Sequence, residues 1–96
     1  MLYALLCTDK PNSSALRADI RPKHLAFIDA HKTQVKIAGP FLSEDGQTMV
    51  GSLIIVEASD MAAARAFAAA DPYAQAGLFA NVEIKPWRWI VGAPKG

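Results

Sequence analysis

The sequence contains a single cysteine, Cys7, and only two histidines among its 96 residues. One thiol cannot form an internal disulfide, and three such side chains are too few for a structural zinc site. His24 and His31 are also about two helical turns apart, whereas histidines that share a metal on one helix lie one turn apart. We therefore expect no metal site. The scarcity of cysteine favours a reducing compartment, and we expect a cytoplasmic protein.

The sequence also lacks a large net charge and long apolar runs. Ten basic and nine acidic residues leave a net charge of +1, and the basic residues are scattered, which argues against nucleic acid as a partner. No apolar run approaches the roughly 20 residues that cross a membrane. The apolar opening MLYALLC lacks a basic leader and a cleavage site, so we expect a first strand rather than a signal peptide. Phosphate-binding loops, dinucleotide fingerprints and nucleophile elbows are missing too, and no cofactor is predicted.

What is present is a regular succession of apolar segments, in a chain whose length predicts one domain, residues 1–96. Apolar residues in strand-like runs predict four strands, and apolar residues at helical spacing predict two helices. In chain order these are strand 2–8, helix 16–31, strand 34–40, strand 48–58, helix 61–70 and strand 81–91. The order β-α-β-β-α-β is typical of the α+β ferredoxin-like fold, a four-stranded antiparallel sheet with both helices on one face.

Proline marks several of the expected boundaries. Pro22 is expected to kink the first helix or to divide it into two pieces. The Gly-Pro pair at 39–40 is expected to end the second strand. Pro72 disfavours helical geometry at the residue before it, so Asp71 marks the end of the second helix. Pro86 places part of the last strand at a sheet edge or bulge.

The first and third expected strands are apolar on both faces. In the first strand, Leu2, Ala4 and Leu6 alternate with other apolar residues. Two helices cover only one face of such a sheet, so the other face requires a cover of its own. A second copy of the same sheet is the simplest candidate, and we predict a homodimer through sheet faces. Trp87 and Trp89, two residues apart on one face of the last strand, are expected to serve packing or dimer contacts.

A few polar residues are candidates for chemistry. His24 lies within the apolar stripe of the first helix, where the pattern alone fits either a core histidine with one hydrogen bond or a general acid or base. Asp71 alone indicates an exposed carboxylate at a helix boundary, and Tyr73 alone indicates a core aromatic. Arg17 and Arg21 border the helical stripe, either solvated or holding a carboxylate or phenolate.

Six segments of the sequence are distinctive together: MLYALLCTDKPNS, LRADIRPKHLAF, AGPF, GSLIIVEA, AAADPYAQAGLF and VEIKPW. In order and spacing, along nearly the whole chain, this set resembles the YCII-related (YciI-like) family, and RPKHLA combined with DPYAQAGLF is a specific signal. The sequence departs from several relatives between the GP and GS motifs, where only FLSEDGQTMV stands. We therefore expect substrate size and access to differ from those relatives.

The resemblance implies a ferredoxin-like dimer of the dimeric α/β-barrel type. It also implies an enzyme with a histidine and an aspartate facing one pocket. The matching positions in this sequence are His24 and Asp71, with Tyr73 and Ser52 as pocket neighbours that bind substrate. If the two side chains meet, Asp71 fixes the tautomer of the imidazole and favours its charged form.

The function that follows is a cofactor-independent enzyme of proton-transfer type, catalysing elimination, isomerisation or hydrolysis of a small polar compound, aromatic-derived ones included. His24 is expected to act as acid or base, Asp71 to orient it, and Tyr73 or Arg21 to bind developing negative charge. One branch of the family is linked to dehydrochlorination of hydroxylated aromatics, which fits this class. Two alternatives stay open. One is a non-catalytic small-molecule-binding or assembly module with a structural His24–Asp71 contact. The other, by analogy of fold, is a cofactor-free monooxygenase.

Overall fold

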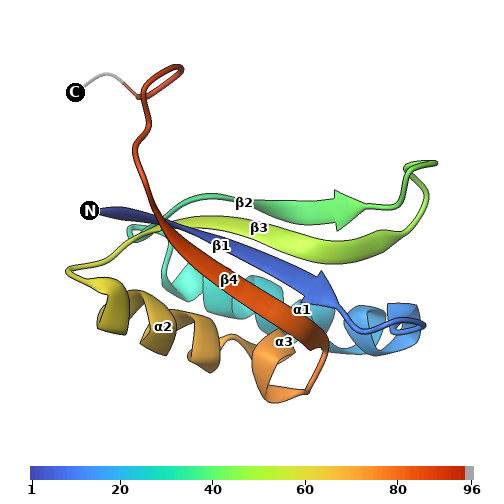
Figure 1. Ribbon diagram of the computed structural model, residues 1–96. Coiled ribbons are helices and arrows are strands. Elements are labelled where there is room, and N and C mark those ends of the chain that lie inside the picture. The colour runs from blue at the N-terminus through green and yellow to red at the C-terminus, as the bar shows by residue number, and fades with distance from the viewer. Residues whose placement is uncertain (95–96) are drawn as a thin grey trace.

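The computed structural model describes residues 1–94, in which four strands and three helices are formed. In chain order these are β1 (Leu2–Asp9), α1 (Ser14–Ala30), β2 (Val35–Leu42), β3 (Met49–Glu57), α2 (Met61–Ala70), α3 (Pro72–Gln75) and β4 (Phe79–Trp87). The strands make one antiparallel sheet in the order β2-β3-β1-β4. Figure 1 shows the helices together on one side of this sheet. The predicted α+β ferredoxin-like architecture is confirmed, with one short helix added.

The core lies between the helices and the sheet face that they cover. Strand alternation turns every second side chain of β1 and β3 toward the helices, where they meet the small residues and one phenylalanine of α2. The cluster consists of Tyr3, Leu5, Cys7, Ile54, Val56, Ala58, Ala64, Phe67 and Ala68. Alanines on α2 leave little bulk between helix and sheet. None of the helices within residues 1–94 is long and apolar enough to cross a lipid bilayer.

The opposite face of the sheet carries no helix within residues 1–94 (Figure 1). Ala4 and Ile55, which pair across β1 and β3, are nevertheless buried there by their neighbours. Around them the larger apolar side chains of Ile37, Phe41 and Trp87 are exposed on the edge strands. The two-sided apolar character expected of the sheet is therefore present, and this open face is the surface on which the homodimer prediction rests.

The expected end of the second strand at residues 39–40 is wrong. β2 continues through both residues to Leu42, and Pro40 keeps a register with Ser52 of β3. Proline is tolerated here because β2 is an edge strand, so the side that lacks an N–H donor faces no neighbouring strand. β4 is the other edge, as Pro86 predicted.

Of the two outcomes expected at Pro22, a division of the first helix is excluded, because α1 runs unbroken from Ser14 to Ala30. The one backbone hydrogen bond that proline forgoes does not outweigh the bonds and packing on either side of it. Trp89 does not share a strand face with Trp87, since β4 ends at Trp87. The two rings still lie near one another beyond the strand end, with centroids 5.7 Å apart.

The short helix α3 was not expected from the sequence, because four residues are too few for a periodic pattern. It forms directly after α2, separated only by Asp71, whose extended backbone ends one helix and begins the next. Pro72 occupies the first turn, where its fixed φ suits a helix start and no donor is needed. This arrangement turns the chain between α2 and β4 and determines where the side chains of Asp71 and Tyr73 lie.

Candidate active site

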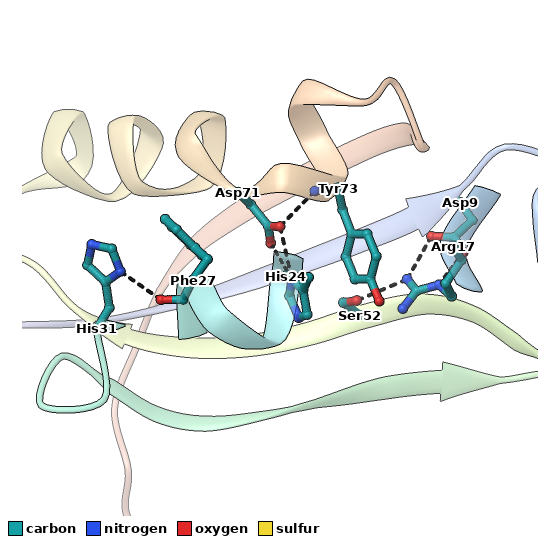
Figure 2. A network of polar contacts seen from close by, with 8 residues as sticks. All are labelled: Asp9, Arg17, His24, Phe27, His31, Ser52, Asp71 and Tyr73. Atoms are coloured by element: carbon teal, nitrogen blue, oxygen red, sulfur yellow. Dashed lines mark hydrogen bonds and ion pairs between the residues drawn. The ribbon is translucent and has the colours of Figure 1, made fainter. Parts of the chain in front are cut away.

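The side chains of His24 and Asp71 meet in the interior of the protein. Nδ1 of His24 lies 2.9 Å and 3.1 Å from the two carboxylate oxygens of Asp71, although 47 positions separate the residues in sequence. Both residues are buried, His24 at 8% and Asp71 at 2% exposure. Because an ionised carboxylate only accepts hydrogen bonds, Nδ1 carries the hydrogen of this contact. Figure 2 shows the carboxylate directed at the imidazole.

Local structure fixes the Asp71 carboxylate in this position. Its Oδ1 also accepts a hydrogen bond from the backbone N–H of Tyr73, at 2.9 Å, which is the N-cap contact of α3. An N-cap aspartate satisfies an otherwise unpaired donor of the first helical turn. The Asp-Pro boundary expected from the sequence is therefore correct, but its carboxylate is buried rather than exposed and joins α1 to α3.

The ring of Tyr73 lies between His24 and Arg17, as Figure 2 shows. The imidazole stacks on the phenol with centroids 4.1 Å apart and planes 17° from parallel. The guanidinium carbon of Arg17 lies 4.5 Å from the centroid of the same ring. His24 and Arg17 are seven residues apart on α1, and the aromatic ring fills the space between them. The three side chains form one row, called here the His24–Tyr73–Arg17 row.

Sequence reasoning missed one residue of the site, Asp9, and left the role of Arg17 open between solvation and a carboxylate partner. The structure shows the second, because Arg17 is 4% exposed and makes a bidentate ion pair with Asp9, at 2.7 Å from Nε to Oδ2 and 2.9 Å from Nη2 to Oδ1. Nη2 also donates to Oγ of Ser52, at 3.0 Å. A signal for Asp9 was present, since it continues the strand alternation of buried Tyr3, Leu5 and Cys7 toward the helices.

A pocket of about 240 Å³ opens beside this row. Its polar lining comes from Arg17, Arg21, His24, Ser52 and Tyr73, which include every sequence-predicted site residue except Asp71. The remaining wall is mostly apolar and is formed by Leu25, Ile28, Ala38, Gly39, Pro40, Met49 and Ile54. The volume lies below the 300–1,000 Å³ usual for drug-sized ligands, so the pocket suits a small molecule.

Nε2 of His24 faces this pocket. This nitrogen has no hydrogen-bond partner among residues 1–94, whereas every fully buried side-chain nitrogen or oxygen in that range has a partner. Nε2 is therefore not fully buried, and since His24 lines the pocket, the pocket is where Nε2 is accessible. With the hydrogen on Nδ1, the neutral ring presents a lone pair at Nε2. A small molecule in the pocket can thus meet a proton acceptor backed by a carboxylate.

Burial and charge set the protonation of the neighbouring groups. Burial raises the pKa of the Tyr73 hydroxyl, although the positive charges of Arg17 and Arg21 act to lower it. The phenol is therefore a neutral hydrogen-bond donor at physiological pH. Burial acts against the charge of Arg17, but the hydrogen bonds and charge of Asp9 outweigh it and raise the pKa of the guanidinium. Burial, assisted by the charge of Asp71, raises the pKa of the Cys7 thiol to about 12, so that it is no nucleophile.

The entrance to the pocket involves Arg21 and the loop after β2. Arg21 is exposed at the rim and makes no ion pair within the described part of the chain. Gln47 and Thr48, at the end of the shortened loop, line an adjoining hollow together with Arg17 and Arg21. The loop thus borders the approach to the site.

His31 takes no part in the site. Its Nδ1 donates to the carbonyl of Phe27, 2.8 Å away at the end of α1, and Figure 2 shows it apart from His24. Between residues 1 and 94, no group of three histidine, cysteine or acidic side chains is placed to hold a metal ion.

Sequence comparison finds relatives along almost the entire chain. The model of the YCII-related domain matches residues 1–88. The proteins named Protein YciI of Escherichia coli O6:H1 (strain CFT073) and of Shigella flexneri are each 35% identical to this chain over 97 residues, covering 94% of this chain and 99% of the relative. An uncharacterized protein of Haemophilus influenzae is 32% identical with the same coverage.

A similar solved structure is 5-chloro-2-hydroxyhydroquinone dehydrochlorinase from Burkholderia phenoliruptrix AC1100, in complex with 2,5-dihydroxybenzoquinone. It matches this chain with a TM-score of 0.84 and 33% sequence identity, over 92% of this chain and 94% of its own. The fold is accordingly of the YciI-like, dimeric α/β-barrel type, as the sequence resemblance implied.

Proposed function

This chain belongs to the YCII-related domain family, and we propose that it is a cytoplasmic, cofactor-independent enzyme of proton-transfer type. It acts on small, polar, aromatic-derived compounds by elimination, isomerisation or hydrolysis. The observation that carries the proposal is the buried contact of His24 with Asp71, at the wall of a pocket that the second imidazole nitrogen faces. A titratable group held in this way, beside a hollow of small-molecule size, is typical of a catalytic site.

His24 carries out the proton transfer in this proposal. Its Nε2 accepts a proton from a C–H or O–H group of the bound compound, whose electron pair stays on the substrate. The positive charge that develops on the imidazole is stabilised by the Asp71 carboxylate, 2.9 Å from Nδ1. The same nitrogen then returns the proton, either to another substrate atom or to a leaving group.

The similar dehydrochlorinase supports the substrate class. That enzyme is named for a chlorinated hydroxyhydroquinone and holds a dihydroxybenzoquinone, at 33% identity to this chain. A flat ring fits a pocket of about 240 Å³ whose wall includes Leu25, Ile28 and Ile54. In an elimination the base removes a proton, the electron pair moves through the ring, and chloride leaves with its bonding pair.

The proposal is tested with a panel of chlorinated and non-chlorinated di- and trihydroxybenzenes. The wild-type protein is expected to release chloride or to exchange ring hydrogens for deuterium without an added cofactor, as measured by ion chromatography and NMR. The His24→Gln variant is expected to react about 10²–10⁴-fold more slowly, because general acid–base catalysis contributes about that factor. Equal rates in both proteins, or no reaction of the wild type with any compound, would refute the proposal. Oxygen consumption in the same assay would instead identify a monooxygenase.

A second candidate function is a non-catalytic binding or assembly module. The observation in its favour is the structural role of Asp71, which caps α3 while it holds His24 of α1. In such a module His24→Ala would lower the free energy of unfolding by about 1–3 kcal/mol, because a buried partner loses its hydrogen bond. No reaction would accompany binding of any compound in the panel.

We also propose that the chain forms a homodimer through the open face of the sheet. The exposed side chains of Ile37, Phe41 and Trp87 lie on the strands at its two edges, and a second sheet would cover them. Light scattering at micromolar concentration is expected to give twice the chain mass of 10.3 kDa. Phe41→Glu is expected to lower the mass toward that of one chain, because a charge would be buried in the interface. A wild-type mass of one chain would contradict the dimer.

A further inference from the structure

The pocket has a second group of buried polar side chains, centred on Arg17, which contacts the ring of Tyr73 as His24 does. It consists of Asp9, Arg17 and Ser52, which come from β1, α1 and β3. The guanidinium of Arg17 links the other two, because it forms an ion pair with the Asp9 carboxylate and donates a hydrogen bond to the Ser52 hydroxyl oxygen. The proton transfer assigned to His24 uses none of them. An ion pair this deeply buried needs a reason beyond stability, since a buried pair stabilises little over an apolar replacement.

The hydrogen bonds of this group leave donors for a ligand, while its one carboxylate, that of Asp9, does not line the pocket. Asp9 is occupied by Nε and Nη2 of Arg17. Nη1 of Arg17 has no hydrogen-bond partner among residues 1–94. Every fully buried side-chain nitrogen in that range has a partner, so Nη1 is not fully buried and is accessible to a ligand. Ser52 accepts from Arg17 with its oxygen, and its hydroxyl hydrogen remains available to donate. Both residues line the pocket.

We propose that Arg17 and Ser52 bind an oxygen atom of the substrate that carries or develops negative charge, and that Asp9 positions the guanidinium for this task. Two donors converging on one oxygen resemble an oxyanion hole, whose preorganised groups stabilise charge as it forms. The bidentate contact with Asp9 prevents the long arginine side chain from turning away, so little reorganisation is needed when the charge appears.

The proposal rests on the proton transfer by His24 and specifies its substrate. Tyr73 lies between His24 and Arg17, with the imidazole centroid 4.1 Å and the guanidinium carbon 4.5 Å from the centroid of the phenol ring. A proton is therefore removed at one end of the bound compound while charge accumulates on an oxygen at the other end. In the step, a bond to hydrogen breaks, an N–H bond forms at Nε2, and the electron pair moves through conjugated bonds to that oxygen. Phenols, enols and quinols whose oxygen is conjugated to the reacting atom satisfy this requirement.

The experiment is a spectroscopic titration of bound 4-nitrophenol, whose phenolate form absorbs at longer wavelength than the phenol. The wild-type protein is expected to lower the apparent pKa of the bound probe by about one unit, equal to a tenfold preference for the phenolate. Ser52→Ala is expected to reduce the shift, and the double variant Asp9→Asn with Arg17→Gln to abolish it. The double variant leaves no unpaired buried charge, so its fold is expected to persist, which circular dichroism checks. Arg65→Gln removes an arginine from α2 outside this pocket and is expected to match the wild type.

The outcomes separate this proposal from the one on His24. No binding of the probe at millimolar concentration, an unshifted pKa in the wild type, or the same shift in Ser52→Ala and the folded double variant would overturn the role of Arg17 and Ser52. Those results would leave the turnover assay with His24→Gln untouched. Conversely, loss of the His24 role through that assay would leave a phenolate-binding pocket with no proton transfer.

Discussion

Replacing Asp71 by asparagine is expected to lower the turnover number by about 10²–10⁴-fold while the protein stays folded. The reason is the tautomer of His24. The backbone N–H of Tyr73 requires an acceptor, so the amide oxygen of asparagine takes the place of Oδ1 in that contact. The amide nitrogen then takes the place of Oδ2, which lies 3.1 Å from Nδ1 of His24. Two N–H groups cannot face each other there, so the amide donates to Nδ1 and the imidazole hydrogen moves to Nε2. The nitrogen that faces the pocket loses its lone pair and cannot accept a proton.

The turnover number and the ¹⁵N chemical shifts of the imidazole together test this expectation. The wild type should show hydrogen on Nδ1, and the Asp71→Asn variant should show it on Nε2. Asp60→Asn is a matched control, since Asp60 also caps a helix by accepting from a backbone N–H, that of Ala63, but is exposed and does not line the pocket. It is expected to retain wild-type turnover. An Asp71→Asn protein with the Nδ1 hydrogen and undiminished turnover would show that the carboxylate does not orient the base.

Replacing Asp9 by alanine is expected to lower the free energy of unfolding by about 3–5 kcal/mol. The side chains of Asp9 and Arg17 are each 5% exposed, and the substitution leaves the guanidinium buried without its counter-charge. Most of the loss comes from that unpaired charge and not from the attraction of the pair itself. Removing both partners, as in Asp9→Asn with Arg17→Gln, is therefore expected to cost less than Asp9→Ala alone.

Denaturation in urea measures these free energies, with the three proteins compared at one pH and one concentration. Glu57→Ala serves as the control, because Glu57 forms an exposed ion pair with the N-terminal amino group. Exposed ion pairs contribute little to the free energy of unfolding, so the urea concentration at the unfolding midpoint of Glu57→Ala is expected to stay near that of the wild type. A midpoint for Asp9→Ala as high as that of Glu57→Ala would mean that water solvates Arg17 in the variant and that Asp9 does not hold it.

Sequence patterns predicted only part of the candidate site. Helical spacing placed His24 on the buried stripe of α1, and the Asp-Pro pair marked the end of α2 at Asp71. The meeting of the two was implied by resemblance to a family and by no pattern, because 47 positions separate them. For Arg17 the pattern left two roles open, since an arginine at the edge of an apolar stripe has the same local sequence whether water or a carboxylate surrounds it.

The sequence by itself determined the order of strands and helices, the apolar character of both sheet faces and the position where α2 stops. These features follow from side-chain periodicity and proline stereochemistry, which act over a few neighbouring residues. Only the tertiary structure decided that β2 passes through Pro40, that α1 passes through Pro22, and that Arg17 lies between Asp9 and Ser52. Such outcomes depend on edge position, packing and partners from distant segments, whose energies no local stretch of sequence contains.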